Sequence, residues 1–172
     1  MDFFELLQMR RSIRAYQPRL VEEAKLTRIL DAARHAPSAG NLQAYIIVIV
    51  RDAAARKALS RAALNQDFIA QVPVVLAFFA RQEMSAAKYH RRGAELYSVQ
   101  DATIACAYAQ LAATQLGLGC VWVGAFDDDA VKRVLKAQAD WRPVGLLPIG
   151  HPVESPKPTP RRPMEELVMD ES

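Results

Sequence analysis

The stretch that decides the fold is Ala102–Phe126, which reads ATIACAYAQLAATQLGLGCVWVGAF and contains no charged residue. A run of this length can span a bilayer. It nevertheless holds two glutamines, two threonines and three glycines, and many of its apolar residues are small alanines. Gly117 and Gly119 also divide it into a helix and a following strand. We therefore expect a long helix, Ala94–Leu116, buried on all sides in the core of a soluble protein, and then a strand at Gly119–Val123.

The segments around this stretch predict an alternation of helices and short strands. Apolar residues recur at helical spacing in Val21–His35, and a helix rich in alanine and charge is expected at Ala53–Leu64. The other expected elements are short helices at Asp2–Met9, Asp67–Gln71 and Asp128–Ala137, and buried strands at Tyr45–Val50, Val74–Phe79 and Pro143–Gly150. The polar segment Arg81–Arg92 is expected to form an exposed flap. The pattern predicts an α+β fold.

The composition is that of an ordinary globular protein, and we expect one domain over residues 1–172. The chain is 51% hydrophobic and 24% charged, with a net charge of +3. Basic and acidic residues are interleaved over most of it, which disfavours a nucleic-acid-binding surface. Cys106 and Cys120 lie in apolar sequence without metal or redox spacing, so we expect buried reduced thiols and a cytoplasmic protein. No secretory signal is expected at the N-terminus, and the three histidines lack metal-ligand spacing.

The C-terminal segment has a composition of its own. Five of the ten prolines lie between Pro152 and Pro163, a spacing that excludes a regular helix or central strand. We therefore expect an extended arm over about residues 153–172. Its end, Met164–Met169, becomes apolar again. The arm either docks on a second subunit or forms a disordered tail, and the apolar tip favours docking.

Two clusters of arginine carry the strongest chemical signal. The segment Arg10–Arg14 reads RRSIR and lies where a helix ends and an extended stretch begins. Alternate side chains of an extended stretch share a face, so Arg10, Ser12 and Arg14 can converge. Guanidinium groups and a hydroxyl suit the oxygens of a phosphate, and the pair Arg161-Arg162 can supply a second clamp. The alternative is a solvated basic patch. Walker, G-x-G-x-x-G and G-x-S-x-G motifs are absent from the sequence, which leaves a Rossmann-type dinucleotide site unsupported.

Four motifs, in order and covering nearly the whole chain, resemble the nitroreductase family. The segment Arg10–Arg14 resembles the basic stretch that holds flavin mononucleotide (FMN) in that family. The other matches are APSAGNLQ at Ala36–Gln43, GLGCVWVGAF at Gly117–Phe126, and LPIGHP at Leu147–Pro152 with the arm through Pro163. The resemblance implies a nitroreductase-like α+β fold. Its central antiparallel or mixed sheet is flanked by helices, its long central helix is buried, and its C-terminal arm is exchanged in a homodimer.

The resemblance also implies which residues hold the phosphate end of FMN. Arg10 and Ser12, with one or both of Arg161-Arg162, grip the phosphate. Arg11 lies along the ribityl chain. Arg14 lies near the pyrimidine edge of the ring, where a fixed cation favours the reduced, negatively charged cofactor.

At the ring end, the resemblance implies contacts from two chains. Gln66 hydrogen-bonds the ring, and the backbone N–H groups of Gly124 and Ala125 address its N5 and O4 atoms. The loop residues Pro37, Ser38, Ala39 and Asn41 pack on the flavin of the other subunit. Each flavin site therefore lies at the subunit interface and needs both chains.

The function that the resemblance implies is hydride transfer from NAD(P)H through flavin N5 to an electron-poor acceptor of nitroaromatic or quinone type. Because the sequence lacks a dinucleotide fingerprint, NAD(P)H is expected to bind transiently and to be replaced by the acceptor in a ping-pong mechanism. Solvent can deliver protons, so no catalytic side chain is predicted. Three alternatives stay open: another acceptor chemistry, such as dehalogenation or enone reduction; a flavin-storing dimer without efficient turnover; and a basic nucleic-acid scaffold.

Overall fold

The computed structural model describes residues 1–171, so Ser172, the last residue of the expected arm, lies outside the described residues. Four strands form one antiparallel sheet in the order β1-β2-β4-β3. They are β1 (Tyr45–Val50), β2 (Val74–Arg81), β3 (Gly119–Cys120) and β4 (Trp141–Gly150). The α-helices are α1 (Phe3–Met9), α2 (Glu23–Arg34), α3 (Ala53–Ala62), α4 (Phe68–Gln71), α5 (Gln82–Arg92), α6 (Ser98–Gln115) and α7 (Asp128–Leu135). The segments η1 (Ala39–Asn41) and η3 (Met164–Glu166) are 3₁₀ turns, and η2 (Gly93–Tyr97) is a π-helical segment. The predicted α+β fold is confirmed.

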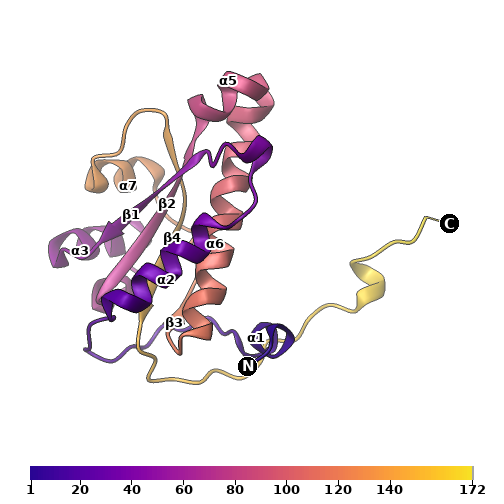
Figure 1. Cartoon of the computed structure of the whole chain (residues 1–172). Coiled ribbons are helices and arrows are strands. Elements are labelled where there is room, and N and C mark those ends of the chain that lie inside the picture. The colour runs from indigo at the N-terminus through magenta and orange to yellow at the C-terminus, as the bar shows by residue number, and fades with distance from the viewer. Residues whose placement is uncertain (172) are drawn as a thin grey trace.

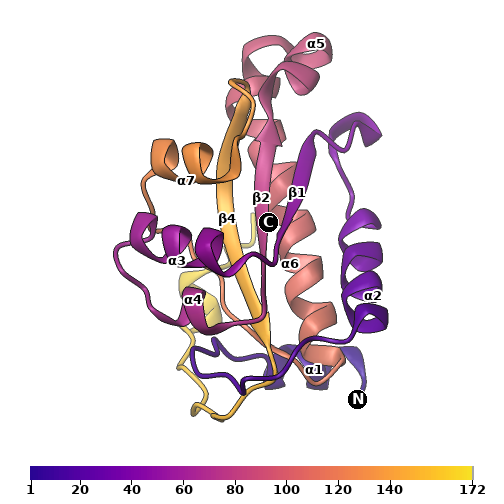
Figure 2. The same ribbon diagram turned by 90° about the vertical axis from the view of Figure 1, so that its left-hand side faces the viewer.

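The central strand β2 is buried on both faces, which explains its unbroken apolar run. Val74, Leu76 and Phe78 pack in one core cluster with α2 and α6. The alternate residues within Val75–Phe79 pack in a second cluster with α3, α4 and α7. Figure 2 shows α2 and α6 on one side of the sheet and α3 and α7 on the other. The sheet is therefore the middle layer of three, and helices shield both of its faces.

Helix α6 lies against the sheet through small residues that allow a close approach. Ala102, Ala105, Ala109 and Ala113 are fully buried. The predicted long helix is confirmed, but the expectation that it is buried on all sides is wrong for the single chain. A stripe along its outer face is exposed or half-buried and carries no charge, and Tyr108 within it is 40% exposed. The stripe consists of Gln100, Ile104, Ala107, Tyr108, Leu111 and Gln115.

Two other expectations differ from the structure. The segment expected as a flap at Arg81–Arg92 is regular: Arg81 ends β2, and Gln82–Arg92 form the helix α5, because these residues include no proline or glycine and many good helix formers. The strand expected at Gly119–Val123 ends after Cys120, although Val123 still forms an isolated bridge to β4. Pro148 of β4 has no N–H to donate across this gap, so the ladder is interrupted there.

The two ends of the chain meet at the C-terminal end of α6. The N–H of Ile13 donates to the Cys120 carbonyl (3.0 Å), and the N–H of Val153 donates to the Ala15 carbonyl (3.1 Å). Gly119 permits the close approach, because a Cβ at this position would lie 2.7 Å from Cγ2 of Ile13. Beyond this point the chain runs away from the body of the molecule (Figure 1), without regular structure except the turn η3. Its apolar tip is exposed in the single chain.

Candidate functional site

The first arginine cluster and the C-terminal arm enclose a cavity of about 480 Å³. Among residues 1–171, the side chains of Arg10 and Arg161 form no ion pair with a carboxylate. Two uncompensated guanidinium groups and the Ser12 hydroxyl therefore border one space. Such a donor set suits an anion with several oxygens, such as a phosphate monoester. The lining residues are Leu7, Gln8, Arg10, Arg11, Ser12, Pro158, Thr159 and Arg161.

The neighbouring arginines are placed differently from these two. The Arg11 guanidinium donates to the carbonyls of Pro156 (3.2 Å), Arg10 (2.9 Å) and Gln8, so it fastens the arm to the first cluster. Arg14 is exposed and does not line the cavity. Arg162 pairs with Glu166 on the arm at 2.9 Å. Of the two arm arginines, the structure thus brings only Arg161 to the cavity.

A second group of predicted residues lies around the peptide Gly124-Ala125. The side chain of Gln66 donates to the Ala63 carbonyl (3.0 Å) and approaches the Ala125 carbonyl at 3.4 Å. Gly124 and Ala125 are both exposed. Ser12 forms a parallel bridge to Cys120, and Gly124 is the fourth residue after Cys120. Four extended residues span at most about 14 Å, so one elongated ligand in the cavity can also reach this peptide.

The loop Pro37–Asn41 is organised by a buried carboxylate on α6. Asp101, which is 2% exposed, accepts hydrogen bonds from the N–H groups of Ala39 (2.9 Å) and Ala44 (3.4 Å). These bonds fix the middle of the loop and the segment that follows it. The sequence analysis did not identify Asp101, although a signal existed: it is the last charged residue before the uncharged stretch that begins at Ala102.

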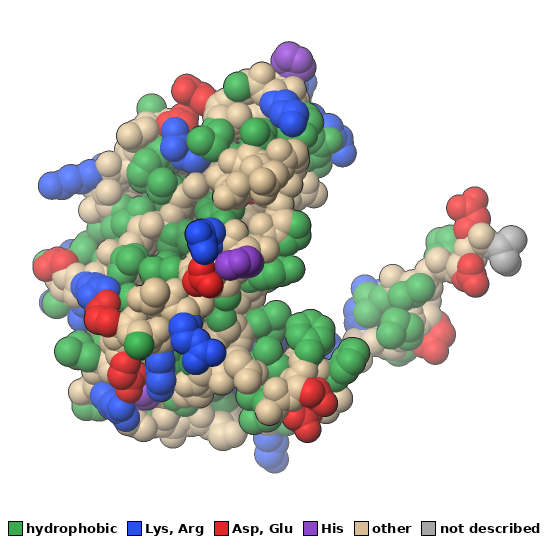
Figure 3. All heavy atoms as spheres, in the orientation of Figure 1, with side chains coloured by type: hydrophobic (Ala, Val, Ile, Leu, Met, Phe, Trp, Pro, Cys, Tyr) green, Lys and Arg blue, Asp and Glu red, His purple; other side chains and the backbone are tan. Residues whose placement is uncertain are grey.

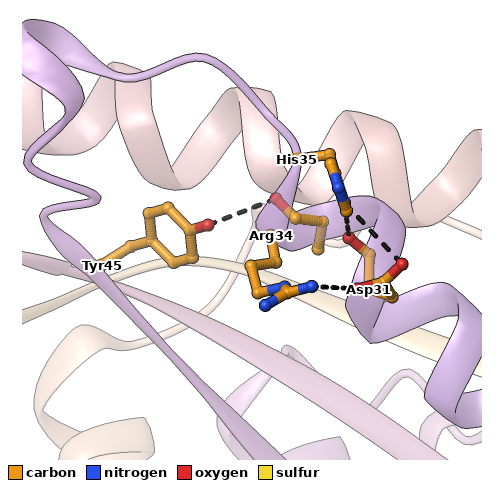
Figure 4. A network of polar contacts seen from close by, with 5 residues as sticks. Asp31, Arg34, His35 and Tyr45 are labelled. Carbon is orange, nitrogen blue, oxygen red and sulfur yellow. Dashed lines mark hydrogen bonds and ion pairs between the residues drawn. The ribbon is translucent and has the colours of Figure 1, made fainter.

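The end of α2 fixes the entry to the same loop (Figure 4). Arg34 forms an ion pair with Asp31 at 2.7 Å, and Nδ1 of His35 lies 2.8 Å from the Asp31 carbonyl. From β1, the Tyr45 hydroxyl donates to the Ala33 carbonyl at 3.2 Å. Burial raises the pKa of the Tyr45 hydroxyl, and the nearby charge of Asp101 raises it further. The phenol therefore stays protonated and remains a hydrogen-bond donor.

The cavity and the loop lie at opposite ends of α6 in one chain. Asp101, which holds the loop, is in the first turn of α6, whereas Ile13 and Gly119 meet just after its last turn. The helical rise from Asp101 to Gln115 is about 21 Å. The structure therefore brings Arg10, Arg11, Ser12 and Arg161 together, and Gln66, Gly124 and Ala125 together. It leaves Pro37, Ser38, Ala39 and Asn41 at the other end of α6 from the cavity within the same chain.

Comparison with known proteins identifies the fold that carries this arrangement. The model of the nitroreductase family matches residues 7–66 and 60–151. The chain belongs to the nitroreductase family. This nitroreductase is similar to a Thermus thermophilus protein named NADH dehydrogenase, with 34% identity over 93% of this chain and 91% of the relative. It is also similar to an FMN reductase [NAD(P)H] from Bacillus subtilis, with 33% identity over 94% of this chain and 70% of the relative.

A solved structure agrees with this assignment. The hypothetical oxidoreductase YcnD from Bacillus subtilis superimposes on this nitroreductase with a TM-score of 0.90 and 31% sequence identity. The match covers 98% of this chain and 73% of that one. The fold of the chain is thus a known architecture.

Three further observations concern membrane-spanning helices, metal ligands and the two cysteines. Within residues 1–171 no helix has both the length and the apolar character needed to cross a bilayer. The same part of the chain contains no group of three or more His, Cys, Asp and Glu side chains placed to bind a metal ion. Cys106 and Cys120 are free and buried, which confirms the prediction for both residues. Burial raises the pKa of the Cys120 thiol to about 12.

Proposed function

We propose that this nitroreductase is an FMN-dependent oxidoreductase that takes hydride from NAD(P)H and reduces a small electron-poor acceptor of nitroaromatic or quinone type. The observation that carries the proposal is the cavity bordered by Arg10, Ser12 and Arg161. Its two uncompensated guanidinium groups suit the terminal phosphate of FMN. The similarity to an FMN reductase supports the same cofactor. When bound, FMN accepts two electrons from the nicotinamide donor and passes them to the acceptor.

The residues of this chain then bind and orient the cofactor. Arg10, Ser12 and Arg161 hold the phosphate, while Arg11 keeps the arm against the cavity through its bonds to backbone carbonyls. The exposed peptide Gly124-Ala125 offers its N–H groups to N5 and O4 of the ring, and Gln66 lies beside it. Arg14, just outside the cavity, supplies a positive charge to the pyrimidine edge. No side chain is assigned as an acid or a base, because solvent can deliver the protons.

We propose further that the complete site forms in a homodimer. The exposed stripe on α6 is uncharged over its whole length, so a second copy can cover it without burying an unpaired charge. A two-fold axis across this stripe sets the two α6 helices antiparallel and brings the cavity of one chain near the loop Pro37–Asn41 of the partner subunit. The arm, with its exposed apolar tip Met164–Met169, then crosses to the partner.

The missing dinucleotide motif bears on the kinetic mechanism, and the buried thiols bear on the cellular compartment. Because the sequence lacks a dinucleotide fingerprint, NAD(P)H would bind transiently and be replaced by the acceptor, so we expect a ping-pong mechanism. The two buried thiols accord with a reducing compartment, and we place the enzyme in the cytoplasm.

The test begins with the colour of the purified protein. We expect a yellow protein whose flavin absorbance is bleached by NADPH or NADH without oxygen and restored by a nitroaromatic or a quinone. Steady-state double-reciprocal plots should give parallel lines. A colourless protein would overturn the flavin site. Bound FMN that neither nicotinamide donor reduces would favour a storage dimer, and recovery with halophenols or enones alone would change the acceptor class. Intersecting lines would replace the ping-pong mechanism by a ternary complex.

A further inference from the structure

The basic run Lys88–Arg92, which reads KYHRR, has no role in the flavin site described above. It lies at the end of α5, where basic side chains gather at one end of the molecule (Figure 3). The rings of Tyr89 and Tyr97 meet edge to face with centroids 5.2 Å apart. Nζ of Lys88 lies 5.4 Å from the Tyr89 centroid, and Cζ of Arg92 lies 5.4 Å from the Tyr97 centroid. Each ring of the aromatic pair thus carries one cation.

These two cations differ from their neighbour Arg91 in having no carboxylate partner within residues 1–171. Arg91 pairs with Glu95 at 2.8 Å. Nε of Arg92 instead donates to the Tyr97 hydroxyl at 3.0 Å, five residues further along the chain. The π-helical turn Gly93–Tyr97 accounts for this contact, because residues five apart are adjacent in a π turn. Lys88 and Arg92 therefore keep their charges available for an external anion.

The cations stand at the edge of the loop that we assign to the flavin. Tyr97 lines a cavity of about 520 Å³ together with Pro37, Ser38 and Ala39. At Gly40, whose φ is +56°, an added Cβ would lie 2.7 Å from Nζ of Lys88. The end of α5 is therefore packed directly on the loop.

The backbone beside the two cations is strained. His90 has φ +52° and ψ −139°, a conformation that is unfavourable for a residue with a side chain and that recurs at binding sites. This break in α5 lies between Lys88 and Arg92, and it sets the direction in which Arg92 leaves the helix. The strain thus falls at the position that brings the two cations to the loop.

We propose that Lys88 and Arg92 bind the phosphate groups of the reduced nicotinamide dinucleotide. The inference rests on the proposed function. In the proposed dimer, the loop Pro37–Asn41 packs on the flavin held by the other chain. Because the end of α5 packs on that loop, a dinucleotide whose nicotinamide reached the flavin would have α5 of the loop-supplying chain beside it for its adenosine half. The anionic groups that reach α5 are the pyrophosphate, present in both donors, and the 2′-phosphate, present in NADPH alone. A short basic helix end then supplies the donor affinity without a Rossmann fold.

The test compares the holoenzyme with the double variant Lys88→Gln/Arg92→Gln and with the control Arg91→Gln. The control removes a positive charge from the same run, but one already paired with Glu95. Anaerobic stopped-flow bleaching of the bound flavin is followed with NADPH, NADH and the phosphate-free donor 1-benzyl-1,4-dihydronicotinamide. In the double variant we expect the second-order rate constant for NADPH to fall by about tenfold or more. The rate with the benzyl donor should be unchanged, and Arg91→Gln should behave as wild type.

Loss with NADPH alone assigns the 2′-phosphate, and equal loss with NADPH and NADH assigns the pyrophosphate. Unchanged rates with both dinucleotides would overturn the inference, and so would an equal loss with the benzyl donor, which would indicate a damaged flavin site. If no donor bleaches the flavin of the wild-type protein, the proposed function itself fails. That outcome is distinct from a normal wild-type reaction with an unaffected double variant.

Discussion

The charged groups near the two ends of α6 find their partners in opposite ways. The cavity end brings Arg10 and Arg161 together from the two ends of the chain and leaves both guanidinium groups without a carboxylate among the described residues. The loop end places the buried Asp101 carboxylate against the N–H groups of Ala39 and Ala44. The first end is completed only by an external anion. The second end is satisfied internally and presents proline and alanine side chains, which suit the face of a ring. A site shared between chains can therefore combine a charged half with a preorganised apolar half.

The largest expected effect is the loss of FMN affinity when the two arginines of the charged half are removed. In Arg10→Ala/Arg161→Ala, FMN loses two charge-assisted contacts worth about 1.5–3 kcal/mol each, so we expect its Kd to rise about 10²- to 10⁴-fold. Flavin-fluorescence titration of the apoprotein measures this change. Arg162→Ala removes an arm arginine that is already paired with Glu166 and should leave the Kd close to wild type. An unchanged Kd in the double variant would show that the phosphate binds elsewhere.

A smaller effect is expected from breaking the internally satisfied half. Asp101→Asn turns an acceptor beside the Ala44 N–H into a donor, so the free energy of unfolding should fall by about 1–3 kcal/mol. Asp67→Asn, an exposed change at a residue whose side chain makes no cap hydrogen bond, is the matched control. Urea unfolding checks both variants. If Asp101→Asn and Asp67→Asn were equally stable, the carboxylate would not be what organises the loop.

The smallest expected effect is the pH dependence of stability that comes from the two buried thiols, Cys106 in α6 and Cys120 in β3. Burial raises the pKa of Cys120 to about 12 and that of Cys106 well above its usual value. Both groups bind protons more tightly when folded, so their contribution is complete below about pH 9 and is lost as the pH rises further. Each thiol should lower the free energy of unfolding by up to about 1.4 kcal/mol per pH unit in that range. Urea unfolding at pH 8 and pH 10 should show a shallower decline in Cys106→Ala/Cys120→Ala; parallel declines in the two proteins would contradict the assigned burial.

Regular periodicity made most of the fold predictable. The strand at Tyr45–Val50 has the predicted bounds, and the other long elements differ by a few residues. The strand after Gly119 was predicted too long because its partner Pro148 is distant in sequence. The helix at Arg81–Arg92 was missed because its polarity suggested a loop, although helix formers fill it. The local hydrophobic pattern thus predicted most helices and strands. The break in the β3–β4 pairing depends on a partner strand, so only the three-dimensional structure shows it.

For the candidate site, the order of the four motifs predicted that residues far apart in the sequence share one site. The sequence analysis predicted that Arg10 and Arg161 converge on one phosphate, and the structure places both residues on the lining of one cavity. The choice of Arg161 over Arg162 was left open, since it depends on the local pairing of Arg162 with Glu166. Asp101 was missed because a single acidic residue on a helix indicates no role until the N–H groups that it contacts are known. The binding roles of these residues stay predictions.

The most direct measurement of the shared site is the flavin content of a mixed dimer. One chain carries Arg10→Ala/Arg161→Ala, and the other carries Ala39→Trp, which fills the cavity beside the loop; differently tagged chains allow the mixed dimer to be isolated. If the two halves come from different subunits, one of the two sites in this dimer is fully wild type. The account therefore predicts half the FMN content of the wild-type dimer, with little FMN in either parent variant. A mixed dimer without FMN would show that each chain builds its site alone, which would contradict the account.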